Sequence, residues 1–390
     1  MKNKTSRTIL FILPSRSWNT KERFAFRDML QAKQHGYNVL LCTYEDSFVS
    51  KMAREHEIEI LPFKLHLLNK FFSYHTHYSL RTAFKKSQID IVHCYDFNFL
   101  CSLSLQLKRK NLTALVMTQG QTIDKPLQRF WYRPIISRID SLILMNKNLK
   151  EDAIGNLGLP NKKIEYFGLG IKNEDVLNPL EVAINFDLYS SHFLAGTYIT
   201  PRMNNLTLLI PLLYGLKVIN AKAPVGVKSK LVFVSPVEYQ SMEILPPLMR
   251  LIQQLDLKED ILFVTTKDFV GVITRLNLWI SHSPDELIED FVVSSLIHEV
   301  PVIFPRNYCT RDFLEEYEGV GETYKIHDSR ELRDKWEKII IGEKAFKEKT
   351  RLYKFFIERE HSFKNYKTQL MNLYAKTVQR RIRLFRGTKK

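Results

Sequence analysis

A segment in the second half of the chain, Trp279–Phe304, combines an apolar strand, a turn rich in carboxylates and a helix expected to begin near Leu287. The unpaired backbone N–H groups and the positive dipole end of such a helix favour a diphosphate. Glu286, in the turn, would accept hydrogen bonds from sugar hydroxyls. Alternatively, the carboxylates simply decorate the first turn of an exposed helix, which the helix dipole also favours.

The rest of the chain alternates short apolar runs with longer amphipathic segments, a pattern typical of strands and crossover helices in a parallel sheet. The strands expected in the first half are Thr8–Leu13, Asn38–Thr43, Ile58–Pro62, Asp90–His93, Ala114–Thr118, Ser141–Met145 and Lys163–Phe167. Those expected in the second half are His192–Ala195, Lys230–Ser235, Asp260–Thr265, Asn277–Ser281 and Val300–Phe304. Asn173–Phe186 interrupts the pattern and is expected to connect two domains. Right-handed crossovers would align the strand carboxyl ends along one edge of each sheet.

Several motifs resemble the retaining GT-B glycosyltransferases of group 1, or family 4. Trp279–Phe304 resembles that family's donor-sugar signature, with Ser283 at its serine, Glu286 at its first glutamate and Ser294 in place of its second. Ile89–Leu100 is similar to a strand end of the family, with His93 and Asp96 at matching positions. The resemblance implies an α/β protein of two Rossmann-like, doubly wound domains facing a central cleft. It places the acceptor-side domain at 1–180, completed by a helix at about 361–390, and the donor domain at 187–360.

The resemblance also implies a site for the donor diphosphate, which the family holds with two cations. Gly196 matches the family's glycine, Thr197 replaces its arginine and Arg202 stands at its lysine. A guanidinium can bind phosphate oxygens in bidentate fashion, so Arg202 is expected to serve in place of the lysine, with Arg275 assisting. Alternatively, Arg202 is an ordinary surface arginine.

Other expected site residues also depart from the family pattern. Ser235 and Thr265 replace glycines next to the nucleotide. Thr265, or alternatively Thr266, is expected to bind the base through its hydroxyl, and Ser294 to lie near the ribose. Gln119 stands at a family histidine and keeps a positioning role in catalysis, because an amide cannot take a proton. Arg16, His93 and Asp96 are expected on the acceptor side, although Arg16 also reads as an ordinary loop cation.

Composition limits the classes of partner. The chain has 390 residues, 45% of them hydrophobic, which is enough for two buried cores. Its formal net charge of +16 calls for an acidic partner. Basic and aromatic residues concentrate in Lys64–Lys86 and Lys125–Arg138, which favours an anionic membrane surface, although ordinary solvated helix faces would look alike. No motif of a nucleic-acid-binding protein supports nucleic acid as the partner.

The four cysteines form no C-x-x-C pair, which favours a reducing compartment and argues against structural zinc. No apolar run reaches the ~20 residues that a membrane-spanning helix needs. We therefore expect a protein of the cytoplasm, peripheral on the inner face of the cytoplasmic membrane.

Together these observations predict a retaining, hexosyltransferase-like enzyme. It would move a sugar from a nucleotide-sugar to a glycan or lipid-linked acceptor in surface polysaccharide or glycoconjugate synthesis. Retention follows from the resemblance alone. No cofactor and no metal are expected, because the family activates its donor with cations and helix ends. The alternative is a non-catalytic GT-B subunit or scaffold for a partner glycosyltransferase, because several of the family's working groups are replaced here.

Overall fold

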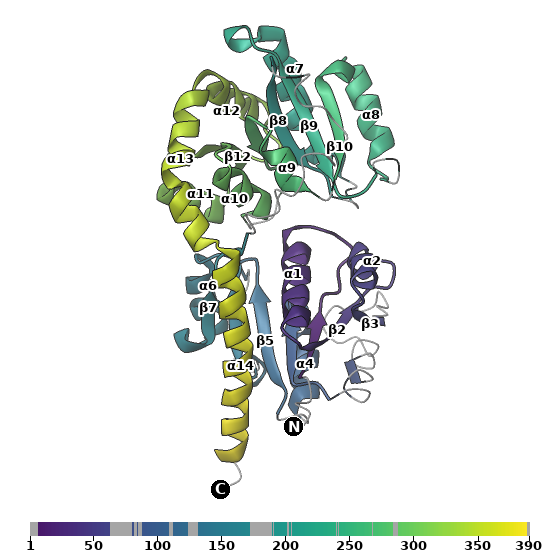
Figure 1. Cartoon of the computed structure of the whole chain (residues 1–390), viewed down its shortest axis with the longest axis vertical. Coiled ribbons are helices and arrows are strands. Elements are labelled where there is room, and N and C mark those ends of the chain that lie inside the picture. Colours follow the sequence, from purple (N-terminus) through teal and green to yellow (C-terminus); the bar gives the residue numbers. More distant parts are fainter. Residues whose placement is uncertain are drawn as a thin grey trace. The chain divides into compact units, whose positions relative to one another are not determined.

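The computed structural model describes residues 7–62, 80–81, 84, 88–108, 112–123, 132–171, 189, 191–200, 203, 205–238, 240, 242–266, 268–283 and 288–387. The chain divides into two compact units. The first unit consists of Met1–Gly170 and Phe363–Lys390, and the second of Ile171–Ser362 (Figure 1). The expected connection, Asn173–Phe186, lies outside the described residues.

In the described part of the first unit, seven strands form one sheet in the order β3-β2-β1-β4-β5-β6-β7. Its strands are β1 (Thr8–Ile12), β2 (Asn38–Thr43), β3 (Glu59–Pro62), β4 (Ile91–Cys94), β5 (Ala114–Gln119), β6 (Ser141–Leu144) and β7 (Ile164–Tyr166). All neighbouring strands are parallel. The order reverses between β1 and β4, and ligands of doubly wound sheets bind beside the carboxyl ends at such a reversal.

The described part of the second unit repeats this arrangement with six parallel strands in the order β10-β9-β8-β11-β12-β13. They are β8 (Phe193–Tyr198), β9 (Ser229–Ser235), β10 (Ile261–Thr265), β11 (Leu278–Ile280), β12 (Val302–Pro305) and β13 (Gly321–Tyr324). The order reverses between β8 and β11. The predicted fold class, two doubly wound α/β domains, is confirmed; β13 was not anticipated.

Helices connect the strands of both units. The first unit contains α1 (Thr20–Gln34), α2 (Phe48–Glu55), α4 (Leu100–Lys108), α5 (Arg133–Ile136), α6 (Leu149–Leu157), α14 (Phe363–Gly387) and the 3-10 turns η1 (Phe97–Phe99) and η2 (Asn161–Lys163). The second contains α7 (Ile210–Lys222), α8 (Leu245–Gln254), α9 (Phe269–Ile273), α10 (Asp290–Ile297), α11 (Tyr308–Glu316), α12 (Ser329–Ile341), α13 (Glu343–Glu360) and the 3-10 turns η5 (Leu206–Leu208), η6 (Pro224–Gly226) and η8 (Lys258–Asp260). Within the described ranges, no helix combines the length and the apolar character needed to cross a bilayer.

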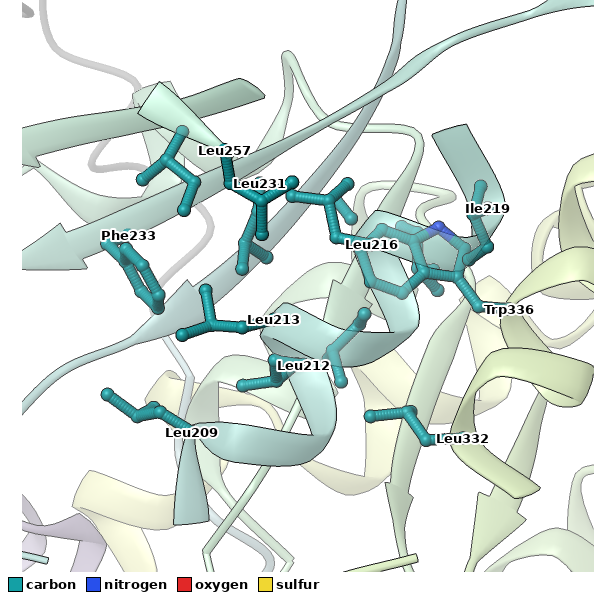
Figure 2. Close-up of a cluster of buried hydrophobic side chains, with 14 of the residues drawn as sticks. Leu209, Leu212, Leu213, Leu216, Ile219, Leu231, Phe233, Leu257, Leu332 and Trp336 are labelled. Carbon is teal, nitrogen blue, oxygen red and sulfur yellow. The ribbon is translucent and has the colours of Figure 1, made fainter. Parts of the chain in front are cut away.

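The core of the second unit shows why its helices stay on the sheet. Leu212 and Leu216 lie one turn apart on α7 and, with Trp336 of α12, are fully buried. Figure 2 shows them in one cluster with Leu231 and other side chains of the unit. Each buried leucine contributes about 1.5–3 kcal/mol relative to an exposed one, so this cluster fixes both helices against the strands.

Helix α14 completes the core of the first unit through buried polar contacts. Tyr366 donates a hydrogen bond to Asp28 Oδ1 on α1 at 2.7 Å. The hydroxyl of Tyr374 lies 2.7 Å from His93 Nδ1 on β4. The close approach of α14 also explains why residue 170 is a glycine. Its φ is +58°, and a Cβ there would lie 2.6 Å from Tyr366 Cγ.

His93 and Asp28 belong to one buried network. The second ring nitrogen of His93 lies 2.7 Å from Thr118 Oγ1, and Tyr95 donates to Asp28 Oδ2 at 2.6 Å. Burial lowers the pKa of His93 to about 3 and raises the pKa of Asp28 to about 6. The imidazole is therefore neutral at pH 7.

The buried imidazole predicts acid sensitivity of the fold. In the unfolded chain His93 takes up a proton near its ordinary pKa of 6.5, whereas in the fold it stays neutral down to about pH 3. Its contribution to the free energy of unfolding is therefore complete above pH 6.5 and falls by about 1.4 kcal/mol per pH unit below it. Between pH 6.5 and 4.5, wild type should lose about 2–3 kcal/mol relative to His93→Gln, measured by urea unfolding.

The matched control is His35→Gln, which removes an exposed imidazole. It should follow the pH dependence of wild type. Identical pH dependence of wild type and His93→Gln would contradict the assignment of a neutral buried imidazole.

Candidate functional site

A pocket lies at the carboxyl edge of the second sheet, where β11 and β12 end. It holds about 240 Å³ of empty space, a figure that includes open solvent, so it is an open depression and not an enclosed cavity. Its lining residues are Ser281, Ser283, Ile288, Glu289, Val292, Phe304, Pro305, Asn307 and Thr310. The expected site residues Glu286 and Leu287, which lie in the chain between Ser283 and Ile288, are outside the described residues.

The helix beside this pocket begins later than expected. We predicted a start near Leu287, but α10 begins at Asp290, so that prediction was wrong. The physical reason is Glu289, whose extended backbone (φ −67°, ψ 143°) makes it the N-cap. Glu289 and Asp290 bring negative charge to the helix N-terminus, where it is favoured by the helix dipole. The same charge would oppose a diphosphate at these N–H groups.

Ser294 lies on the second turn of α10 and is 5% exposed. Its hydroxyl oxygen is buried and has no hydrogen-bond partner. Ser294 is not among the residues that line the pocket. A ribose hydroxyl would therefore reach it only if neighbouring side chains moved.

Packing inside the sheet explains Gly196, which we expected to bind the donor. A Cβ at this position would lie 2.2 Å from Leu276 Cδ1 and 3.2 Å from Trp279 Cε3. Gly196 also lies inside β8, paired with Trp279 on β11, and the whole strand is buried. Core packing therefore accounts for the glycine, whatever ligand the unit binds.

Thr197, the replacement for the family's arginine, is fully buried and hydrogen-bonded. It donates to the Ile280 carbonyl at 2.6 Å, and its hydroxyl lies 2.9 Å from His282 Nδ1. Because the only hydroxyl proton goes to Ile280, His282 Nδ1–H must donate to Thr197. Burial lowers the pKa of His282 to about 4, so this ring is neutral. Arg202, the expected phosphate-binding cation, lies outside the described residues.

Two other expected donor residues occupy opposite edges of the second sheet. Thr265 is exposed at the carboxyl end of β10, and β9 separates that strand from β8. Arg275 precedes β11 at the amino edge, next to Asn277, whose side chain accepts from Leu194 N at the start of β8 (2.9 Å). The structure therefore does not bring Arg275 together with Ser283, because the strands separate them.

At the carboxyl edge of the first sheet, Arg16 and Asp96 follow β1 and β4, the two strands at the reversal of strand order. Arg16 forms an ion pair with Asp46 at 3.4 Å, and its guanidinium lies 5.2 Å from the Tyr44 ring centroid. Asp96 Oδ1 accepts from Asn98 N at 2.9 Å and caps η1. His93, expected in the same group, is instead fully buried, with both ring nitrogens engaged inside the fold.

Gln119 ends β5 and is held by its amide nitrogen. Nε2 donates to the Gln121 carbonyl at 3.1 Å and to Asp152 on α6. Asp152 also accepts from Asn156 Nδ2 at 2.6 Å and from Ile123 N at 3.2 Å. Gln119 Oε1 is buried and has no partner. The fixed amide is suited to positioning and cannot act as a base.

Several residues of these sites were not predicted from the sequence. Asp152 reads as an ordinary acid in the first turn of a helix. Asn307, in the pocket wall, accepts from Thr310 N at 2.9 Å, and Thr310 donates to the Pro305 carbonyl at 2.8 Å. An Asn followed three residues later by a Thr, directly after a strand, is a helix-capping pattern and could have revealed this wall.

Metal-binding side chains do not gather anywhere in the described ranges: no group of three or more His, Cys, Asp or Glu residues could hold an ion. Cys42, Cys94, Cys101 and Cys309 are buried and form no disulfide.

The assignment of Gly196 to core packing gives a prediction. Gly196→Ala should destabilise the protein by about 1–3 kcal/mol, because the added methyl overpacks the space beside Leu276. In the double variant Gly196→Ala/Leu276→Ala, the two costs should be clearly less than additive in thermal or urea unfolding, because the second change removes the clash. Strict additivity would show that the two positions do not share this space.

The comparisons with known proteins agree with this architecture. Residues 23–174 match Glycosyltransferase Family 4. A glycosyltransferase from Rickettsia africae ESF-5 superposes with a TM-score of 0.71 at 14% identity, over 96% of this chain and 99% of that chain. No curated protein sequence gives a significant match.

Two further solved structures extend over nearly the whole chain. Anabaena HepE, solved in complex with UDP-glucose, gives a TM-score of 0.67 at 14% identity, covering 95% of this chain and 99% of HepE. Sucrose-phosphate synthase from Thermosynechococcus elongatus gives 0.68 at 12% identity, covering 95% and 98%. The chain is therefore a protein of the GT-B fold, and residues 23–174 of it match Glycosyltransferase Family 4.

Proposed function

We propose that the chain is a retaining glycosyltransferase that moves a sugar from a nucleotide-sugar to a glycan or lipid-linked acceptor. The observation that carries the proposal is the family match over residues 23–174 in a chain of the GT-B fold, whose two units each have a doubly wound sheet. HepE, similar over nearly its whole length, was solved with UDP-glucose, which supports a nucleotide-sugar as donor. We place the reaction in surface polysaccharide or glycoconjugate synthesis.

In this proposal the donor lies at the carboxyl edge of the second sheet. The pocket there offers Ser283, Glu289 and Asn307 as hydrogen-bond partners for sugar hydroxyls. Arg202 holds the diphosphate and Glu286 faces the transferred sugar. Charge developing on the leaving diphosphate is stabilised by fixed groups, without metal or cofactor, and much of the rate comes from positioning.

The acceptor lies at the carboxyl edge of the first sheet. Arg16 and Asp96 flank the reversal of strand order there, and the rigid amide of Gln119 orients the incoming group. Four buried cysteines that form no disulfide support a reducing compartment. We therefore place the protein in the cytoplasm, peripheral on the inner face of the cytoplasmic membrane.

A second candidate is a non-catalytic GT-B subunit that supports a partner glycosyltransferase. Two observations favour it. First, Thr197 occupies the position of the family's diphosphate-binding arginine, and its hydroxyl is buried and hydrogen-bonded inside the unit. In addition, Glu289 and Asp290 stand at the N-terminus of α10, where negative charge weakens anion binding.

Calorimetric titration with a panel of nucleoside diphosphates separates these candidates. For the enzyme we expect one nucleotide to bind below millimolar concentration, and Arg202→Ala to weaken that binding by about 1.5–3 kcal/mol, the range for a hydrogen bond to a charged group. Glu286→Ala should lower transfer or donor hydrolysis while binding is retained.

Arg275→Ala is the matched control, because it removes an arginine from the opposite edge of the same sheet; it should bind nucleotide like wild type. The enzyme proposal would be excluded if wild type binds no nucleoside diphosphate at millimolar concentration and the Arg202 and Glu286 variants match it in every assay. The proposal of a non-catalytic subunit would then replace it.

The acidic start of α10 gives a separate prediction. Glu289→Gln removes one negative charge from the helix N-terminus, so nucleoside diphosphate binding should tighten by about 0.3–1 kcal/mol at low ionic strength. The control is Glu243→Gln, an exposed acid elsewhere in the second unit. Weaker diphosphate binding by Glu289→Gln would contradict this repulsion and would instead assign Glu289 a direct contact with the nucleoside diphosphate.

A further inference from the structure

One face of α13 is fixed to the second unit. Thr350 and Ile357 are fully buried on this face. Lys354 forms an ion pair with Glu299 at 3.2 Å, and Tyr317 donates to Glu360 at 2.7 Å. These contacts set the rotation of the helix about its own axis, and therefore which side chains face water.

The opposite face of α13 exposes large apolar side chains. Leu352, Phe355 and Phe356 are 63%, 65% and 50% exposed. Their spacing of three and four residues places them together on one side of the helix. Single exposed apolar residues are common on soluble proteins, but three adjacent ones on a fixed helix face form a patch that marks an interaction surface.

Positive charge surrounds this patch. The exposed charged residues of α13 are four cations and one carboxylate: Lys344, Lys349, Arg351, Arg359 and Glu348. The Arg359 guanidinium lies 6.0 Å from the ring centroid of Phe355 and 5.8 Å from that of Phe356. A cation at this distance from an aromatic ring is held at the edge of the apolar patch.

We propose that this face of α13, the α13 surface, docks onto an anionic lipid bilayer. Phe and Leu side chains at the centre would enter the interface between headgroups and acyl chains, while the arginines and lysines around them would meet negative headgroups. Four exposed cations against one exposed carboxylate, Glu348, leave a net positive charge around the apolar centre, which fits a uniformly anionic plane. The net charge of +16 adds long-range attraction to that plane.

The α13 surface is distinct from the basic segments Lys64–Lys86 and Lys125–Arg138, most of which lie outside the described residues. Its assignment uses no residue of the proposed transfer site. The membrane-docking proposal can therefore be tested independently of the transferase activity.

Co-sedimentation of the full chain with vesicles tests the proposal. Wild type should bind phosphatidylglycerol vesicles, be released by salt and bind phosphatidylcholine vesicles poorly. Phe355→Gln/Phe356→Gln should weaken binding at least tenfold. Arg351→Gln/Arg359→Gln should weaken it by roughly fivefold for each charge removed.

Matched controls come from the same unit. Tyr214→Gln/Met249→Gln removes two exposed apolar side chains from α7 and α8, which are 45% and 39% exposed. Lys217→Gln/Lys258→Gln removes two exposed cations. Both controls should bind vesicles like wild type, and circular dichroism should show all variants folded.

An environment-sensitive dye reports the contact directly. A nitrobenzoxadiazole label on Phe356→Cys should shift to the blue when phosphatidylglycerol vesicles are added, whereas the same label on Tyr214→Cys should not. The native thiols are buried, and burial raises the pKa of Cys42 to about 12, so they should resist labelling.

Vesicle binding by Phe355→Gln/Phe356→Gln equal to that of wild type would overturn the proposal, as would an unshifted label at position 356 on bound protein. A wild type that is dimeric in analytical ultracentrifugation, with a monomeric Phe355→Gln/Phe356→Gln variant that still binds vesicles, would assign the α13 surface to a second copy of the chain and overturn it equally.

Discussion

The first unit depends on hydrogen-bond partners for two buried polar side chains, the carboxylate of Asp28 and the imidazole of His93, inside a parallel α/β core. Buried polar groups are costly unless they are hydrogen-bonded. Asp28 accepts from Tyr95 and Tyr366, and His93 lies between Tyr374 and Thr118. Two of these four partners come from α14, so the helix is required for the polar core as well as for its apolar contacts.

Residues of the same network also contact Gly170, where the chain leaves the first unit. The neighbour of Asp28, Arg27, donates to the Gly170 carbonyl at 2.9 Å, and its guanidinium lies 4.6 Å from the Tyr366 ring centroid. Gly170 ends the first stretch of the unit, and Tyr366 is near the start of the second. One arginine therefore contacts both stretches of the chain close to their boundaries with the second unit.

Sequence patterns predicted the fold well because parallel strands buried on both faces appear as continuous apolar runs. β13 was not predicted because its central Glu322 is polar and interrupts the apolar pattern. In the fold, Glu322 forms ion pairs with Lys335 and Lys338 of α12. The candidate site was harder to predict. Motif alignment assigned site roles to His93 and Gly196, but their surroundings in the fold depend on Tyr374 and Leu276, which lie far from them in the sequence. The alignment of a motif with the sequence carries no information about such packing between distant residues.

The division of the first unit into two stretches has a consequence for protein synthesis. A ribosome finishes the whole second unit, Ile171–Ser362, before α14 emerges. Until then Asp28 lacks Tyr366 and His93 lacks Tyr374, and the surface that α14 will cover stays open. The second unit can fold during translation, whereas the first must wait in an incomplete form. A nascent chain of this protein therefore exposes its earliest-made half for longest, and that half is where chaperones would be most needed during translation.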